Sequence, residues 1–500
     1  MDSAIRVRFS RPPNLTRNWV CHLIQPGSIL SIIPAFSMIS GCTHRNHSIL
    51  TIEKETHMKN SRALHDELKH IVGTSGVLPE AESASYAIDG CVPKAVVLPT
   101  SVQEIQDILQ FAAKQDLSVI PAGAGTKLGI GNPPQKVDVV LSTAHLNSVV
   151  EYEPADLTVT VEAGIRLADL QKELAKHRQF LAMNPPYAER CTIGGIVATN
   201  TSGSFRLRHG TARNQVLGMR VVHANGTVVK SGGKVVKNVA GYDLNKLYIG
   251  AFGTLGIITE VALKLSPIPT RQAIVATEFQ DLQNTVNTGL SIVSSQTLPM
   301  FVNLFINFDP RYPETPGQRK FMLVTGFGGD PETVAWQSAQ SRELMEQNGG
   351  KGVTTIEDES HQHIQETIQE FSATNENTEN VIVKINLKRT DIVAFSEQII
   401  SASWRQDVQM MALLGNGVLY LNIPVVPETD FQALSDVLTV LRQSALEMRG
   451  TLIIETAPPE LKRHIDVWGP VGNTLHLMKQ VKAKFDADGL LNPGRFIASI

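Results

Sequence analysis

The stretch from Thr192 to Leu265 constrains the fold more than any other part of the chain, because it is rich in glycine and still strongly patterned. It begins Thr-Ile-Gly-Gly-Ile-Val-Ala-Thr-Asn and continues to Gly-Thr-Leu-Gly-Ile-Ile-Thr-Glu at residues 253–260. Glycines at this density allow positive φ angles and let the backbone approach a ligand closely. We therefore interpret the stretch as half of a cradle for a large bound molecule.

A second glycine-rich loop, Pro-Ala-Gly-Ala-Gly-Thr-Lys at 121–127, follows a predicted strand–helix–strand unit. The helix of this unit begins at Ser101 with Glu104 three residues later, which is a capping box. Such a loop presents backbone N–H groups to a phosphate. It is neither a Walker loop nor a Gly-x-Gly-x-x-Gly motif, since Gly129 comes one position late. Taken alone, a phosphate loop and a plain tight turn both remain open.

The remaining pattern predicts an α+β fold with more than one domain, as expected for 500 residues. Strands are expected at 149–153, 157–162 and 257–265, and Asn225-Gly226 marks a β-hairpin. Beyond Pro269, strands alternate with amphipathic helices, which indicates an open-faced α+β domain. The predicted divisions are 1–57, 58–268, 269–457 and 458–500.

Charge and cysteine content exclude several classes of function. A formal charge of −3 supplies no basic field for nucleic acid. The four cysteines show no C-x-x-C spacing, so we expect neither a zinc site nor an iron–sulfur cluster held by this chain alone; they are Cys21, Cys42, Cys91 and Cys191. If the chain is a redox protein, its electrons must therefore leave through a partner.

The first 57 residues differ from the rest and are expected to be an extension of the folded part. Four arginines precede an apolar run at 29–39, which is too short to cross a membrane and ends in Ile-Ser-Gly-Cys. This arrangement is similar to a bacterial lipoprotein signal, and the alternative is a start codon assigned too early, with Met58 as the true start. We favour the second interpretation and expect a cytoplasmic protein that reaches the inner face of the membrane only through partners.

The order of these motifs resembles the FAD-binding domain of the vanillyl-alcohol oxidase / p-cresol methylhydroxylase (PCMH) superfamily, over roughly Ala63 to Ile500. Within it, the chain most resembles the FAD-binding (E) subunits of bacterial glycolate oxidase, also called glycolate dehydrogenase. The resemblance implies a PCMH-type two-subdomain FAD-binding domain, then an open-faced α+β cap of the FAD-linked oxidase C-terminal type. It also implies a tail that returns to the FAD domain, and partners: a catalytic flavoprotein subunit and an iron–sulfur subunit.

The resemblance assigns FAD contacts to both glycine-rich segments and to the strand that follows. The first loop would hold the pyrophosphate, the second segment would close over pyrophosphate and isoalloxazine, and the strand would meet the adenine. The residues are Pro121, Ala122, Gly123, Ala124, Gly125, Thr126 and Lys127, then Thr192, Gly194, Gly195, Thr199 and Asn200, and finally Ile258. For Thr199 and Asn200 the alternative is turn capping. Non-covalent attachment is expected, although Cys191 and His209 lie near this cradle.

The sequence indicates fewer residues for the substrate site than for the FAD site. Related 2-hydroxy-acid dehydrogenases carry metal-binding histidines in a Gly-Asp/Asn-Gly-Asn-x-His segment and a later Glu-His pair. The corresponding segments here, 411–420 and 450–457, have none of these histidines, so no metal site is expected. The remaining pocket candidates are Lys384, Asn416 and Tyr420. Lys384 would neutralise a carboxylate, while the ordinary role of a strand lysine is a solvated edge charge.

Three functions follow from this pattern. The first is a non-covalent FAD subunit of a glycolate oxidase complex (glycolate to glyoxylate), which relays electrons or supports a catalytic subunit. The second is a stand-alone FAD-dependent dehydrogenase of a small 2-hydroxy acid of the lactate type. The third is an assembly subunit without a redox role.

Overall fold

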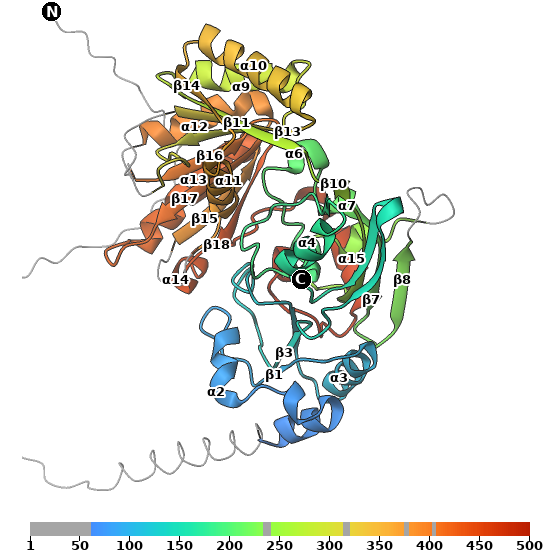
Figure 1. Cartoon of the computed structure of the whole chain (residues 1–500). Helices are drawn as coiled ribbons and strands as arrows, with labels where there is room; N and C mark the ends of the chain where they lie inside the picture. Colours follow the sequence, from blue (N-terminus) through green and yellow to red (C-terminus); the bar gives the residue numbers. More distant parts are fainter. Residues whose placement is uncertain (1–61, 234–241, 314–320, 375–379, 403–406) are drawn as a thin grey trace, which may run out of the picture. The chain divides into compact units, whose positions relative to one another are not determined.

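The computed structural model of the chain describes residues 62–233, 242–313, 321–374, 380–402 and 407–500. The predicted extension 1–57 lies outside these ranges. The described residues form one compact unit, in which a three-stranded and a five-stranded sheet lie on one side and an eight-stranded sheet on the other (Figure 1). Below, "two-sheet part" denotes the three- and five-stranded sheets with their helices, and "cap" denotes the eight-stranded sheet with its helices.

The first sheet contains the strand–helix–strand unit that precedes the first glycine-rich loop. Its parallel strands β1 (Ala95–Val97), β3 (Val139–Ser142) and β2 (Val119–Ala122) are adjacent in that order. Helix α3 (Val102–Lys114) buries one apolar face against the sheet, and the oxygen of Ser101 accepts its first-turn bond from the Glu104 amide at 3.2 Å. The Glu104 carboxylate accepts from the amide of Thr100 at 2.7 Å, one residue earlier than a capping box requires.

The second sheet is antiparallel and contains the stretch that opened the sequence analysis. Its order is β4 (Val149–Glu153), β5 (Thr158–Glu162), β9 (Ile257–Lys264), β7 (Val216–Val222) and β8 (Val228–Gly232). Strands β7 and β8 form the predicted Asn-Gly hairpin, with Gly226 at φ +80°. Helix α4 (Leu167–Ala175) and the short α5 (Ile193–Thr199) pack on this sheet. The glycine pair 194–195 thus lies inside a helix.

The cap is one antiparallel sheet with helices on both faces. The strand order is β14 (Lys351–Ile356), β11 (Arg271–Phe279), β13 (Phe321–Gly329), β12 (Phe301–Ile306), β16 (Gln409–Leu413), β17 (Val418–Pro424), β15 (Asn380–Asn386) and β18 (Thr451–Thr456). One face carries α9 (Leu282–Ser294), α10 (Pro331–Gln347), α12 (Ile392–Ser401) and α13 (Phe431–Glu447). Part of the other face, predicted to be open, is covered by α11 (Ser360–Glu370) and by Phe205 of the two-sheet part.

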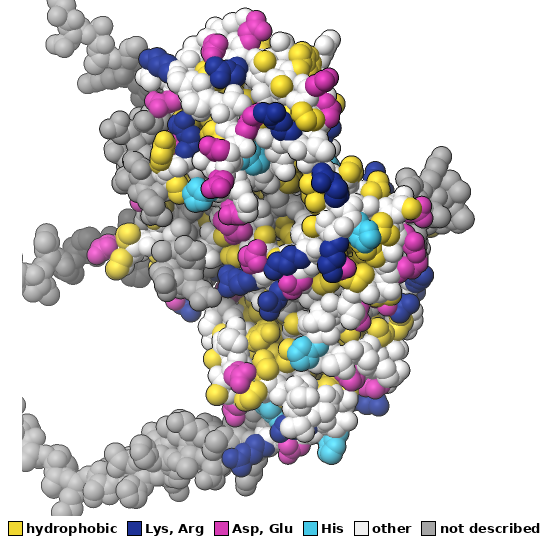
Figure 2. Space-filling model, in the orientation of Figure 1, with side chains coloured by type: hydrophobic (Ala, Val, Ile, Leu, Met, Phe, Trp, Pro, Cys, Tyr) yellow, Lys and Arg dark blue, Asp and Glu magenta, His cyan; other side chains and the backbone are white. Residues whose placement is uncertain are grey.

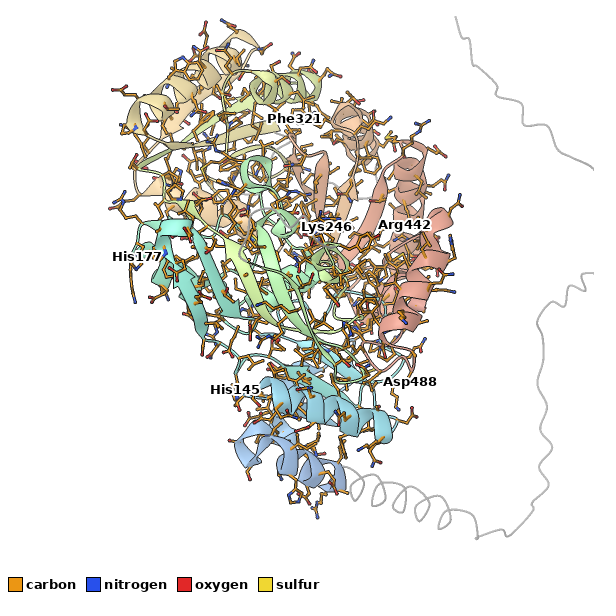
Figure 3. The ribbon with its side chains drawn as sticks, turned by 90° about the vertical axis from the view of Figure 1, so that its right-hand side faces the viewer. His145, His177, Lys246, Phe321, Arg442 and Asp488 are labelled. Carbon is orange, nitrogen blue, oxygen red and sulfur yellow. The ribbon has the colours of Figure 1, made fainter. Side chains whose placement is uncertain are left out.

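Figure 3 shows the same division from the side. Phe321 at the start of β13 and Arg442 on α13 belong to the cap, whereas His145 and His177 belong to the two-sheet part. The Arg442 guanidinium donates to the carbonyls of Leu452 at 3.2 Å and Val467 at 3.3 Å. It therefore joins α13 to β18 and to the segment that leaves the cap.

The C-terminal segment runs back to the two-sheet part through α14 (Pro459–Lys462) and α15 (Leu475–Phe485). Leu491 forms a parallel bridge with Val119 on β2, the edge strand of the first sheet. The amide of Val119 donates to Leu490 at 2.8 Å, and the amide of Asn492 donates to Val119 at 2.9 Å. The divisions at 268 and 457 stay predictions, although β9 and β11 do belong to different sheets.

A buried carboxylate, Asp138, ties β3 to the strand beside it, and we expect Asp138→Ala to lower the free energy of unfolding by about 3 kcal/mol. Its carboxylate accepts from the Ser118 amide at 2.7 Å and lies 2.7 Å from Lys94 and 3.1 Å from Lys136. Asp116→Asn, which removes an exposed negative charge beside the same Lys136 and suits the positive φ of this position, should change stability by less than about 0.5 kcal/mol. Urea titration of both variants measures the difference.

The Asp138 contribution should also depend on pH. Burial alone would raise the pKa of Asp138, but Lys94, the Ser118 amide and Lys136 hold it below its ordinary value of 3.8. A lowered carboxyl pKa stabilises the fold above the unfolded-state value and loses that contribution as pH falls through the folded-state value. The difference in free energy of unfolding between wild type and Asp138→Ala should therefore become smaller below pH 3.8. The same free-energy difference at low pH as at neutral pH would contradict a lowered pKa for Asp138.

Candidate functional site

A cleft of about 900 Å³, part of which is open to solvent, lies along the first glycine-rich loop. Four segments distant in sequence line it: 121–130, 191–201, 252–258 and the C-terminal pair Asn492 and Arg495. On the face seen in Figure 2, Lys and Arg side chains gather among acidic ones where the cap adjoins the two-sheet part. The cleft is therefore formed by the segments that carry the sequence motifs.

Residues 121–127 all line this cleft, and their backbone is prepared for an anion. The amides of residues 123–127 donate to no acceptor in the described part of the chain. Gly125 has φ +79°, a conformation that favours glycine and turns successive amides toward one side. At Gly123 a Cβ atom would lie 2.0 Å from Oγ1 of Thr192, so only glycine fits between the two segments.

The second segment, from Thr192 to Asn200, forms hydrogen bonds within itself, unlike the loop 123–127. Thr192 is the N-cap of α5, and its oxygen accepts from the Gly195 amide at 3.3 Å. The Thr199 hydroxyl donates back to the Gly195 carbonyl at 2.8 Å. Asn200 ends the helix at φ 48°, which is the capping role considered as its alternative, and it does not line the cleft. Its buried Oδ1 accepts no hydrogen bond within the described residues.

Several cleft residues were not predicted from the sequence. Ile258 lines the cleft beside Phe252, Gly253, Gly256 and Ile257, and its contact with adenine stays a prediction. The Gly-Thr-Leu-Gly motif indicated the segment that leads into β9, whereas no sequence motif indicated that Thr143 or Ile130 would line the cleft. Asn492 and Arg495 belong to the Asn-Pro-Gly-Arg segment of the tail. That segment was assigned to the FAD domain, but not to the cleft.

The cleft matches the chemistry of FAD. Five unpaired amides suit the two phosphates of a dinucleotide. Apolar side chains such as Leu128, Ile196 and Phe252 provide surfaces on which flat rings can pack. The observations on this cleft are therefore those that an FAD site requires.

The two candidates for a covalent link to flavin lie in different places. Cys191 lines the cleft, but burial raises the pKa of its thiol to about 12, which leaves little reactive thiolate at neutral pH. His209 is not among the cleft residues; its ring packs edge-on against Phe180, and burial lowers its pKa to about 4. Neither environment favours attachment.

A buried ionic cluster lies where the first loop reaches the cap. Nζ of Lys384 on β15 is 3.2 Å from Glu455 on β18, and Nζ of Lys127 is 3.8 Å from the same carboxylate. The side chains of all three are between 12% and 16% exposed. Tyr420 on β17 pairs across the sheet with Lys384, and its ring centre lies 5.7 Å from Nζ. Arg206 is close enough to act electrostatically on Lys384, Tyr420 and Glu455.

The cluster carries more positive than negative charge. Burial alone would raise the pKa of Glu455, but Lys384 and Lys127 hold it below its usual value. Burial alone would lower the pKa of Lys384, but Tyr420 and Glu455 raise it. Burial raises the pKa of Tyr420, so its phenol is neutral at pH 7. Two lysines thus share one carboxylate, and Arg206 adds a third positive charge nearby. Nε of Arg206 has no acceptor among the described residues.

The cluster contains two of the three pocket candidates predicted from the sequence. Lys384 lies on a strand between β17 and β18 rather than at a solvated edge, and it is brought together with Tyr420. Asn416 lies in the turn between β16 and β17 and shares no hydrogen bond with them in the described structure. Glu455 and Arg206 were missed, because their partners are distant in sequence. Among the described residues, no group of three His, Cys, Asp or Glu side chains is arranged to hold a metal ion.

Comparison with known families identifies both halves of the described unit. The family described as "FAD binding domain" matches residues 93–232, and "FAD linked oxidases, C-terminal domain" matches residues 268–496. The solved structure of p-cresol methylhydroxylase superimposes with a TM-score of 0.69 at 14% identity, over 88% of this chain and 96% of that one. The predicted PCMH-type α+β fold and the predicted FAD cofactor are thereby confirmed.

Two curated relatives span most of the chain. The glycolate oxidase subunit GlcD of Bacillus subtilis is 26% identical over 420 residues, covering 81% of this chain and 89% of that protein. A D-2-hydroxyglutarate dehydrogenase of Stutzerimonas stutzeri is 26% identical over 464 residues, covering 87% and 99%. Since the glycolate oxidase relative is a D subunit, the assignment to the E subunit stays a prediction. In the described ranges, no helix has the length and apolar character that crossing a bilayer requires.

We expect Gly123→Ala to weaken FAD binding by roughly tenfold or more, because the added Cβ must push the loop and Thr192 apart. Gly129→Ala is the matched control: no atom lies within 4 Å of its Cβ position, and its φ is not positive. FAD fluorescence titration of the apo-proteins gives both dissociation constants. Equal affinities for the two variants would show that the close approach at Gly123 does not shape the site.

Proposed function

We propose, from the premise that this chain belongs to the FAD-linked oxidases of the PCMH type and is an FAD-dependent oxidoreductase, that it is the FAD-binding subunit of a glycolate oxidase complex. In this proposal the chain binds FAD non-covalently through residues 121–127 and the segment from Thr192 to Asn200, with Ile258 near the adenine. The complex oxidises a small 2-hydroxy acid, glycolate to glyoxylate. A catalytic flavoprotein subunit and an iron–sulfur subunit are the proposed partners.

The observation that carries the proposal is the direct connection of the phosphate loop to the ionic cluster. The loop with its five unpaired amides ends at Lys127, whose ammonium group reaches Glu455 of the cap. A cofactor held on this loop would therefore lie beside a buried site with excess positive charge. Such a site suits a carboxylate, which every 2-hydroxy acid carries.

Each residue of the cluster has its own role in this proposal. When bound, FAD supplies the hydride acceptor. Lys384 and Arg206 would neutralise the carboxylate. Glu455 pairs with Lys127 and with Lys384, which holds both side chains in place. The Tyr420 phenol can donate a hydrogen bond to a substrate oxygen while it is neutral.

A supporting role in a complex is favoured over independent turnover because the cluster lacks a suitable base. A general base works best with a pKa near the operating pH. The pKa of Glu455 is lowered, whereas those of Tyr420 and Lys384 are raised, so all three are shifted away from neutrality. The cluster can bind an acid, but these three groups are poorly suited to remove its hydroxyl proton.

The alternative is a stand-alone FAD-dependent 2-hydroxy-acid dehydrogenase. The excess of positive charge at the cluster favours it, as does the relative named as a D-2-hydroxyglutarate dehydrogenase. The third candidate, an assembly subunit without a redox role, would keep the fold without needing the unpaired amides.

Purification of the chain alone and with its partners separates these functions. We expect the isolated chain to show the visible spectrum of bound FAD, which glycolate and lactate do not bleach, and the complex to be reduced by glycolate. Rapid bleaching of the isolated chain would favour the stand-alone dehydrogenase. A colourless chain that still assembles an active complex would contradict the proposal in favour of the assembly subunit.

We also expect Lys384→Met to weaken binding of glycolate to the isolated FAD-loaded chain by roughly 10–100-fold, because a charge-assisted contact to the carboxylate is lost. Isothermal titration calorimetry gives the dissociation constant. The FAD content of the variant should not change, since Lys384 does not line the cleft. Lys388→Met, two residues beyond the end of β15 and exposed, is the matched control and should bind glycolate like the wild type. Unchanged glycolate affinity in Lys384→Met would remove Lys384 from the proposed substrate site.

A further inference from the structure

The backbone that follows the phosphate loop is bound by two cations from the C-terminal segment. Nζ of Lys462 donates to the Gly129 carbonyl at 2.6 Å. The Arg495 guanidinium donates through Nη2 to the carbonyls of Leu128 and of Ile130, the latter at 2.6 Å. Three consecutive carbonyls, 128–130, are therefore each satisfied by a side chain more than 300 residues away in sequence.

These two cations are part of the interior rather than of the surface. The side chain of Lys462 is 2% exposed and that of its ion-pair partner Asp89 is 5% exposed, with 2.6 Å between Nζ and Oδ1. Arg495 is 5% exposed, and its Nη1 donates to Oδ1 of Asn492 at 3.1 Å. A buried carbonyl that loses a charged donor is left unsatisfied, so these contacts determine where the backbone can lie.

The same segment holds the backbone on the other side of the loop. Val119, four residues before Gly123, exchanges hydrogen bonds with Leu490 and Asn492. After the loop, the Asn132 amide donates to the Arg495 carbonyl at 3.0 Å. A Cβ atom on Gly131 would lie 2.6 Å from that carbonyl, so the two backbones are in direct contact. The C-terminal segment thus fixes the loop at both ends while the amides of 123–127 stay unpaired.

We propose that Arg495 and Lys462 are positioning residues for FAD, which hold the loop 123–127 with its amides directed into the cleft. Neither residue has to contact the phosphates for this role, although Arg495 lines the cleft. Their two positive charges lie beside the loop that would hold the diphosphate of FAD, and Asp89 pairs with Lys462 only. The inference concerns cofactor binding alone and holds whichever substrate or partner the chain has.

The test compares FAD affinity with the stability of the apo-protein in a graded pair of variants. Arg495→Met removes both carbonyl contacts and should weaken FAD binding roughly 100-fold, whereas Arg495→Lys can keep one contact and should weaken it roughly tenfold. Lys462→Met combined with Asp89→Asn removes the second cation without leaving a buried charge and should also cost roughly tenfold. Arg463→Ala is the matched control, since its guanidinium is 67% exposed beside Glu460.

The full chain is measured at 25 °C by FAD titration, with far-ultraviolet circular dichroism and the apo melting temperature as further readouts. We expect all variants to remain folded without FAD, with melting temperatures within about 5 °C of the wild type, while only the Arg495 and Lys462 variants lose affinity. Wild-type affinity in the Arg495 variants would overturn the proposal. So would a loss of affinity that is equal for Arg495→Lys and Arg495→Met and follows their loss of apo stability, because that pattern indicates a structural role only.

Discussion

The described structure depends on keeping five consecutive backbone amides unpaired in an ordered loop. These partly exposed amides form no bond within the described protein, so the loop must be held in place by contacts outside it. Here the order comes from both sides: Thr192 touches the loop at Gly123, and the tail binds the residues that precede and follow it. The C-terminal segment and the glycines therefore serve the same purpose, which is to hold the loop 123–127 in place.

Local signals in the sequence were sufficient for the elements that form from neighbouring residues. The capped helix after Ser101, the Asn-Gly hairpin and the loop 121–127 each depend on residues a few positions apart, and all three are present. Two adjacent glycines, Gly194 and Gly195, lie in helix α5 although glycine is a poor helix former. Tertiary packing overrides this propensity: a Cβ on Gly194 would lie 2.7 Å from Cβ of Ala163, so glycine is what allows α5 to approach the sheet.

The parts of the site that sequence reasoning missed are those made by distant contacts. Glu455 stood in the sequence without its expected histidine, and nothing local indicated that two lysines would share it. Its role follows from the strand order β17-β15-β18, which places Lys384 between Tyr420 and the strand of Glu455. The same order explains why Lys384 is not an edge charge. A single sequence without the register of these strands cannot supply that information.

Lys127 links cofactor binding to the position of the cap. It ends the loop of unpaired amides, pairs with Glu455 at 3.8 Å and lies 5.4 Å from the ring centre of Tyr187. The amide of Tyr187 donates to Glu370 of α11 at 2.8 Å, so a second contact with the cap adjoins the first. A ligand bound to this loop would therefore lie next to contacts that join the two-sheet part to the cap. The ionic cluster itself combines side chains from both parts, because Lys127 comes from the loop and Lys384 and Glu455 come from the cap.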